Sequence, residues 1–331
     1  MGVRAAILGT GYMGIGHAKR LKTAGAQVVC ICNRNAASRM RFKEELQDES
    51  ISEYEDFDEM LEKEEFDVLF ICIPPFAQGD QFEKAAEKGI HIFIEKPIAM
   101  NTVIGERMVK AAENNHIITS VGFHMRYGEA VKKLKNLIEE GKAGRPVLFH
   151  GHWGCNSLHS PWWKNVDLCG GQIFEQAIHV YDLCRYFIGD PKFVAAIMNN
   201  QCHSNIAGYT IEDVSASISG FTNGAIASIT ANNCEIPDKG GADFKVVFEK
   251  VVADFTDFNH AVFTYTAETP VRTEIYESEI DPYMDEVLEF LHCVEEGKDT
   301  SCNIKEGYKS LVFVEKAVES TRMDGIKVPV H

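Results

Sequence analysis

A glycine-containing turn near the start of the chain constrains the fold more than any other feature. The apolar run Val3–Leu8 leads directly into Gly9-Thr10-Gly11-Tyr12-Met13-Gly14, and a helix-like stretch follows to Lys22. Three glycines at this spacing permit a tight turn, let the backbone approach a pyrophosphate, and let the helix pack closely on the strand. The helix N-terminus favours the phosphate charge. The segment therefore predicts a dinucleotide-binding turn; a glycine-rich turn in some other α/β domain is the alternative.

Apolar runs and helical stretches alternate through the first part of the chain. The helical stretches, such as Asp80–Lys88 and Val103–Asn114, are rich in Ala, Glu and Lys and polar on one face. Strands that are apolar on both faces and alternate with helices indicate a parallel sheet covered on both sides. We therefore predict a doubly wound α/β domain of Rossmann type over residues 1–122, with its ligand crevice beyond the carboxyl ends of the strands. The predicted strands are Val3–Leu8, Val28–Cys32, Val68–Ile73, Ile90–Ile94 and Ile117–Val121.

The pattern changes after Gly122. Beyond Pro191 the segments alternate apolar and polar residues, and Asn223-Gly224 between two of them is a strong hairpin signal. We predict a second α/β domain over residues 123–331, built on an open, mainly antiparallel sheet. Its expected helices are Glu129–Glu140, Phe174–Phe187, Asp285–Glu296 and Lys305–Ser320. Its expected strands are Val147–Trp153, Val214–Ile218, Ala225–Thr230, Phe244–Phe248, Val251–Phe255 and Ala261–Thr266.

Composition limits the classes of partner. The 331 residues carry a formal net charge of −16 at pH 7, and the basic residues form no cluster or stripe. Nucleic acid and anionic membranes attract clustered positive charge, so neither is an expected partner. No apolar run reaches the roughly 18 residues needed to span a bilayer. The first strand begins without the pattern of a secretory signal, and the ten cysteines are scattered, so we expect a cytoplasmic protein.

A lysine follows the fourth predicted strand. Ile90–Ile94 ends in Glu95-Lys96-Pro97, and the carboxyl ends of parallel strands are where reacting groups collect in a nucleotide-binding sheet. A lysine held there could hydrogen-bond a substrate hydroxyl and stabilise the alkoxide that forms as hydride leaves the carbon. Pro97 permits a cis bond, which would aim the ammonium inward. The alternative is a surface lysine before a proline that ends the strand.

A glutamate and a histidine form the second candidate pair. Glu175 and His179 are four residues apart, so on a helix they share one face. Histidine can accept a hydroxyl proton at neutral pH, and a neighbouring carboxylate would orient it. A surface pair or a core histidine is the alternative, and Gly170-Gly171 with apolar flanks favours a buried site only in combination with Lys96.

Together these motifs resemble the Gfo/Idh/MocA oxidoreductases. The resemblance rests on the glycine turn, Glu95-Lys96-Pro97, the segment Gly170–His179 and the closing segment Val314–Ser320, and it covers nearly the whole chain. It implies a Rossmann domain, a second domain with an open sheet that joins homodimers or homotetramers, and Lys96 and His179 as the catalytic pair. Many members carry Asp where this chain has Glu175, which leaves the role of Glu175 open. The predicted cofactor contacts are Gly9, Thr10, Gly11, Tyr12, Met13, Gly14, Asn33, Arg34, Ile73, Pro74, Glu95 and Lys96.

The residues after the second strand bear on the choice of dinucleotide. An NAD site usually has a carboxylate there to hold the ribose 2′-hydroxyl, whereas this chain has Asn33-Arg34. Arg34 could pair with a 2′-phosphate, so we favour NADP over NAD; a solvated arginine is the alternative.

Aromatic and polar residues predict a substrate wall. Trp faces and polar groups suit a polyhydroxylated ring, although the tryptophans could instead pack in the core. The resemblance assigns Met125 and Arg126 to substrate contact, and the predicted wall comprises Met125, Arg126, His152, Trp162 and Trp163. No metal is expected, because His150, His152, Cys155 and His159 lack a matching second pair of ligands at zinc spacing.

These observations predict an NAD(P)-dependent oxidoreductase that acts on a secondary alcohol or ketone of a sugar, cyclitol or related polyol. Two alternatives remain at this stage. One is a glycosidase of the same family that keeps NAD bound, and the other is a non-catalytic dinucleotide sensor. Lys96 and His179 together count against the sensor.

Overall fold

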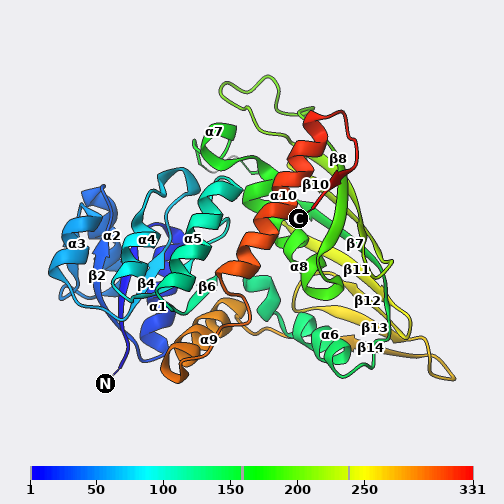
Figure 1. The fold of residues 1–331 in the computed structure, drawn as a ribbon, viewed down its shortest axis with the longest axis horizontal. Helices are drawn as coiled ribbons and strands as arrows, with labels where there is room; N and C mark the ends of the chain where they lie inside the picture. The colour runs from blue at the N-terminus through cyan, green and yellow to red at the C-terminus, as the bar shows by residue number, and fades with distance from the viewer. Residues whose placement is uncertain (1, 158–159, 238, 331) are drawn as a thin grey trace. The chain divides into compact units, whose positions relative to one another are not determined.

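The computed structural model describes residues 2–157, 160–237 and 239–330, and these form two compact units (Figure 1). The first unit comprises Met1–Gly122 with Tyr283–Tyr308, and the second comprises Phe123–Pro282 with Lys309–His331. The first unit therefore includes a late segment of the chain that the predicted domain division placed in the second domain.

A parallel six-stranded sheet forms the centre of the first unit, in the order β3-β2-β1-β4-β5-β6. The predicted α/β Rossmann class is confirmed. The strands are β1 (Arg4–Leu8), β2 (Gln27–Cys32), β3 (Ser52–Tyr54), β4 (Val68–Ile71), β5 (His91–Ile94) and β6 (Thr119–Val121). The helices are α1 (Tyr12–Thr23), α2 (Ala36–Leu46), α3 (Phe57–Lys63), the 3₁₀ turn η1 (Pro75–Ala77), α4 (Gln81–Glu87), α5 (Thr102–Asn114) and α9 (Pro282–Glu296).

Helix α9 belongs to the first unit because its apolar face enters that core. Phe290 meets the rings of Phe70 and Phe93 edge-on, with ring centroids 5.7 and 5.9 Å away. Val287 is buried in the same cluster. Burial of apolar surface of this kind contributes about 25 cal/mol per Å², so this helix contributes substantially to a core formed mostly by the first 122 residues.

A nine-stranded sheet forms the second unit, in the order β14-β13-β12-β11-β7-β10-β9-β8-β15. Only β7 and β10 run parallel and all other neighbours are antiparallel, so the predicted mainly antiparallel sheet is confirmed. The strands are β7 (Pro146–Gly154), β8 (Pro191–Asn199), β9 (Val214–Phe221), β10 (Ile226–Asn232), β11 (Gly241–Phe248), β12 (Val251–Phe255), β13 (Ala261–Tyr265), β14 (Arg272–Tyr276) and β15 (Val328–Pro329).

Helices cover one face of this sheet (Figure 1). Tyr181 of α8 donates a hydrogen bond to Ser217 of β9 at 2.7 Å, and its ring meets Phe313 of α10 edge-on. On the other face, Ile218 and Ile226 are more than half exposed. The helical elements are η2 (His124–Tyr127), α6 (Glu129–Glu139), α7 (Val166–Cys169), a π-helical turn (Ile173–Ala177), α8 (Ile178–Ile188) and α10 (Ile304–Arg322), whose first residues belong to the first unit.

Within the described ranges, no helix is both long enough and apolar enough to cross a membrane.

Candidate active site

The glycine turn between β1 and α1 has the geometry that a bound dinucleotide requires. Gly9 has φ +101°, and a Cβ there would lie 2.5 Å from the carbonyl oxygen of Cys72. A Cβ on Gly14 would lie 2.0 Å from the Gly9 oxygen, so helix and strand could not pack this closely with any larger residue. A Cβ on Gly11 would meet nothing within 4 Å, which leaves its backbone open to a phosphate.

The surroundings of Thr10 and Tyr12 are consistent with a dinucleotide site at this turn. Thr10 is 3% exposed, and its Oγ1 finds no hydrogen-bond partner among the residues that the structure describes. A buried hydroxyl normally has a partner, so Thr10 is suited to a ligand or water at the turn. Tyr12, at the first position of α1, is 88% exposed. The residues present therefore fit a dinucleotide, with its pyrophosphate at the N-terminus of α1.

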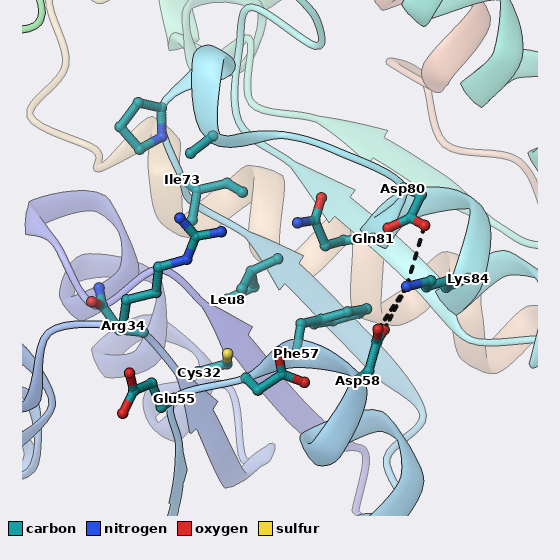
Figure 2. Close-up of a pocket in the computed structure, with 14 residues that line it drawn as sticks. Leu8, Cys32, Arg34, Glu55, Phe57, Asp58, Ile73, Asp80, Gln81 and Lys84 are labelled. Atoms are coloured by element: carbon teal, nitrogen blue, oxygen red, sulfur yellow. Dashed lines mark hydrogen bonds and ion pairs between the residues drawn. The ribbon is translucent and has the colours of Figure 1, made fainter.

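A cavity of about 280 Å³ lies at the carboxyl ends of β1, β2 and β4 (Figure 2). It is the position in a Rossmann sheet where the adenosine half of a dinucleotide binds. The structure brings the predicted Asn33, Arg34, Ile73 and Pro74 together there. The sequence analysis did not identify the remainder of the lining, which includes Glu55, Asp56, Phe57, Asp58, Asp80, Gln81 and Lys84. Residues 55–58 directly follow β3, whereas Asp80, Gln81 and Lys84 lie at the start of α4.

Arg34 differs from the other basic groups near this cavity. Lys84 lies between Asp58 and Asp80, with its Nζ 2.7 and 3.2 Å from their carboxylate oxygens (Figure 2). Arg39 donates to the Asn33 carbonyl oxygen at 2.6 Å. Arg34 is exposed and makes no hydrogen bond or ion pair within the described part of the chain. Its guanidinium is thus available to a ligand.

Lys96 follows the last residue of β5 by two positions and is half-buried, and its bond to Pro97 is cis. The preceding Glu95 points into the first unit, where one carboxylate oxygen lies 2.6 Å from Nε2 of His17. His17 is fully buried and Glu95 is 9% exposed. This buried bond fixes the backbone that carries Lys96. A cofactor contact by Glu95 stays a prediction.

The candidate base of the second unit, His179, lies among rings. Its imidazole stacks on Trp153, with centroids 5.9 Å apart and 22° between the ring planes. His124 and Phe123 meet it edge-on, at 4.7 and 5.8 Å. His179 is 3% exposed. Ring packing of this kind restricts rotation of the imidazole, which a group that exchanges a proton at one fixed point requires.

The segment before His179 is not a regular α-helix. Ile173–Ala177 forms a π-helical turn before α8 begins at Ile178, so Glu175 and His179 do not have the spacing assumed from an α-helix. The Glu175 carboxylate accepts a hydrogen bond from the Trp163 indole at 2.7 Å. Glu175 therefore holds the tryptophan segment in place. That Glu175 also orients His179 stays a prediction.

Arg126 lies in a buried ion pair. Its Nε and Nη2 donate to the two carboxylate oxygens of Asp182 at 2.7 and 2.6 Å. Ser310 donates to the same carboxylate at 2.7 Å. The guanidinium thus joins η2 to α8, a structural role that the sequence did not reveal because the two residues are 56 positions apart. A substrate contact by Arg126 stays a prediction.

The other predicted wall residues have different surroundings. Trp163 is completely buried with Cys169 and Tyr209, and Trp162 packs against that cluster. Met125 is 4% exposed. His152 bonds Thr230 and Glu235, and its position in β7 alternates with that of Trp153, so the two side chains lie on opposite faces of the sheet. A substrate contact by His152 stays a prediction.

The residues considered as zinc ligands also have different surroundings. His150 bonds Ser228, whereas Cys155 is buried and donates to Gln176 at 3.0 Å. Among the described residues these side chains form no metal-binding group. His159 lies outside the described residues.

The fold and the turn define a class of protein, the oxidoreductases that join an NAD-binding Rossmann domain to a second α/β domain. The model of the oxidoreductase family with the NAD-binding Rossmann fold matches residues 3–123, and that of the GFO/IDH/MocA C-terminal domain matches residues 131–253. The chain belongs to the Gfo/Idh/MocA family, which confirms the resemblance found in the sequence.

Individual relatives are distant. The chain is 33% identical over 189 residues to scyllo-inositol 2-dehydrogenase (NAD(+)) of Bacillus subtilis (strain 168), a match covering 56% of this chain and about half, 54%, of that relative. It is 24% identical over 332 residues to myo-inositol 2-dehydrogenase of Thermotoga maritima, covering 97% of each. Levoglucosan dehydrogenase in complex with NADH and levoglucosan superposes over 100% of both chains with a TM-score of 0.91 at 19% identity, which shows the shared fold.

Proposed function

We propose that the protein is an NAD(P)-dependent oxidoreductase that interconverts a secondary alcohol and a ketone on a sugar, cyclitol or related polyol. The observation that carries the proposal is the position of Lys96, which follows a strand of the same sheet that bears the dinucleotide turn. Two relatives named as inositol 2-dehydrogenases support the substrate class.

Each proposed residue has a distinct task. When bound, the nicotinamide supplies the hydride acceptor or donor. His179 takes the hydroxyl proton during oxidation and returns it during reduction. Lys96 hydrogen-bonds the reacting oxygen and stabilises its developing negative charge. Glu175, through its bond to Trp163, keeps the aromatic segment before His179 in place.

A screen of polyols tests the proposal. The purified protein is incubated with NAD or NADP and a panel of inositols, sugars and anhydrosugars while nicotinamide absorbance is followed. Substrate-dependent reduction of the nucleotide supports the proposal. Release of a sugar substituent with retained cofactor and no net nucleotide reduction would identify the NAD-retaining glycosidase instead. Nucleotide binding without turnover on any compound would identify the sensor.

The proposal extends to NADP as the preferred dinucleotide. No carboxylate stands at Asn33, where NAD enzymes hold the ribose 2′-hydroxyl, and the Arg34 guanidinium is available beside the cavity. The relative from Bacillus subtilis is named with NAD(+), so this preference would be a departure from it.

The proposal also includes self-association through the open face of the nine-stranded sheet. In β9 the inward positions hold buried Ser215, Ser217 and Ser219, whereas the outward positions hold exposed Val214 and Ile218. An outward face more apolar than the inward one is typical of an interface between subunits. We propose that a second copy of the chain covers this open face.

We also propose that the protein acts in the cytoplasm, because its ten cysteines are free.

A further inference from the structure

One cysteine of this protein is accessible, and a second thiol lies beside it. All ten cysteines fall within the described residues, and Cys202 alone is exposed. Its Sγ and that of Cys234 lie within 4.8 Å of each other, together with a carboxylate oxygen of Asp213. Cys202 belongs to the connection between β8 and β9, and Cys234 follows β10. The pair is independent of the residues assigned to the reaction.

Hydrogen bonds hold both cysteines at these positions. The Asp213 carboxylate accepts the backbone N–H groups of Gln201, Cys202 and His203 at 2.8, 2.7 and 2.9 Å. The Cys234 N–H donates to the Asn232 side chain at 3.0 Å, and its thiol donates to the Asp213 carbonyl oxygen at 3.7 Å. The juxtaposition is therefore built by the two loops, and bringing the sulfurs from this range to the roughly 2 Å of an S–S bond needs a local movement.

We propose that Cys202 and Cys234 form a reversible disulfide when the protein meets a low-molecular-weight disulfide such as oxidised glutathione. The Cys202 thiolate attacks the external disulfide, forming a mixed disulfide and releasing one thiolate. Cys234 then loses its proton and attacks the Cys202 sulfur, which releases the second external thiolate. Two protein thiols are thereby oxidised to one disulfide, and one external disulfide is reduced to two thiols.

The environments of the two thiols set the order of these steps. Burial, together with the neighbouring Cys202 thiol and the Asp213 charge, raises the pKa of Cys234 to about 12. The exposed Cys202 therefore meets the oxidant first, and attack by Cys234 is the slower step because it requires the thiolate.

The same cluster is less suited to a metal ion. The Asp213 carboxylate already accepts three backbone N–H groups, which makes it a poorer third ligand for a metal.

The cross-link would stiffen a network that extends to the π-helical turn. Asn233, next to Cys234, accepts from the Ser157 N–H at 2.8 Å, and its side-chain oxygen lies 3.1 Å from the Cys155 sulfur. Cys155 donates to Gln176. Oxidation of the pair thus restrains the backbone beside the segment that precedes His179.

Peptide mapping by mass spectrometry tests the proposal. The reduced full chain is incubated with oxidised glutathione, alkylated and digested. We expect one linked pair of peptides containing Cys202 and Cys234, lighter by two hydrogen atoms and lost after dithiothreitol treatment. Cys234→Ser should stop at Cys202 carrying glutathione. Cys72→Ser, which removes another partly buried thiol, should leave the linked pair intact.

Two results would overturn it. One is wild-type Cys202 that remains a mixed disulfide with glutathione, as in Cys234→Ser, however long the incubation. The other is stoichiometric zinc on the purified protein that protects both thiols from alkylation and is lost in Cys202→Ser, because the pair would then be a metal site.

Discussion

Arg34 is the residue on which dinucleotide choice depends in this account. We expect Arg34→Ala to weaken NADPH binding by tenfold or more and to change NADH binding little, because a charge-assisted bond to phosphate contributes about 1.5–3 kcal/mol. Fluorescence titration with both nucleotides measures this. Arg41→Ala, which removes an exposed arginine of α2, is the matched control and should change neither affinity. A preference of the wild type for NADH would contradict the assignment.

His17 is a second residue with a specific structural task. We expect His17→Phe to destabilise the protein by about 2–4 kcal/mol, because the ring volume against Phe70 and Phe93 stays while the buried Glu95 loses its partner. Urea unfolding measures the change in midpoint. His292→Phe, at a histidine whose side chain is 65% exposed in α9, is the control and should have little effect. Equal effects of the two substitutions would show that the His17–Glu95 bond contributes little.

At the residue scale, contiguous motifs could be predicted from the sequence, whereas contacts between distant residues could not. The glycine turn was predictable because its residues are contiguous and the spacing of its glycines is specific. The His17–Glu95 bond joins residues 78 positions apart, and no local pattern marks the pair. For the same reason, the ion pair of Arg126 with Asp182 was not predicted, although Arg126 is itself a predicted site residue and Asp182 lies three positions after His179.

At the scale of elements, the carboxyl group of Glu212 lies next to the π-helical turn and has a raised pKa. Glu212 accepts the Ile173 N–H at 2.7 Å, and a Cβ on Gly171 would lie 2.5 Å from its oxygen. Burial raises the pKa of Glu212 from 4.5 to about 7. The folded protein thus binds this proton more tightly than the unfolded chain. Stability therefore falls as pH rises from the unfolded pKa to the folded one.

Glu212→Gln tests this effect. The amide stays neutral and can still accept the Ile173 N–H, so we expect the variant to match the wild type near pH 4.5 and to exceed its stability at pH 8 by on the order of 1 kcal/mol. Thermal unfolding as a function of pH provides the measurement. Glu139→Gln, at a carboxylate whose side chain is 62% exposed in α6, should show no such pH-dependent gain. A constant difference across the pH range would rule out titration of Glu212 as the cause.

Element prediction succeeded where periodicity was strong. The apolar runs of β1, β4 and β5 and the helices α4 and α5 lie within a few residues of their predicted bounds. β3, with three residues at the sheet edge, carries no apolar pattern. The π-helical turn was missed because its sequence also suits an α-helix, and its geometry depends on Glu212 and Trp163 elsewhere in the chain.

At the scale of the whole molecule, the sheet of the second unit exposes apolar side chains on its open face. We expect Ile218→Asp to shift the protein from the proposed oligomer to a smaller species, because a charge would be buried in the proposed interface. Light scattering after gel filtration reports the mass. Val103→Asp, at a residue 70% exposed in α5, is the control. A wild-type monomer would refute the proposed interface.

The division of the chain into two units could be predicted from the sequence only in part. The change of pattern at Gly122 coincides with the end of the first long segment of unit 1. The sequence predicted a helix over Asp285–Glu296. It could not show that Phe290 would join Phe70 and Phe93, since an apolar face does not specify which core it enters.

The rate of hydride transfer in the Lys96→Met variant tests most directly the central proposal, that Lys96 acts on the reacting oxygen. Once a substrate is known, single-turnover reduction of the bound nucleotide should slow by a factor of about 100 or more, with nucleotide affinity retained, because the variant lacks the ammonium proposed to stabilise the reacting oxygen. Lys110→Met, at a lysine whose side chain is 64% exposed in α5, should react at the wild-type rate. A Lys96→Met rate within a few-fold of wild type would contradict the account.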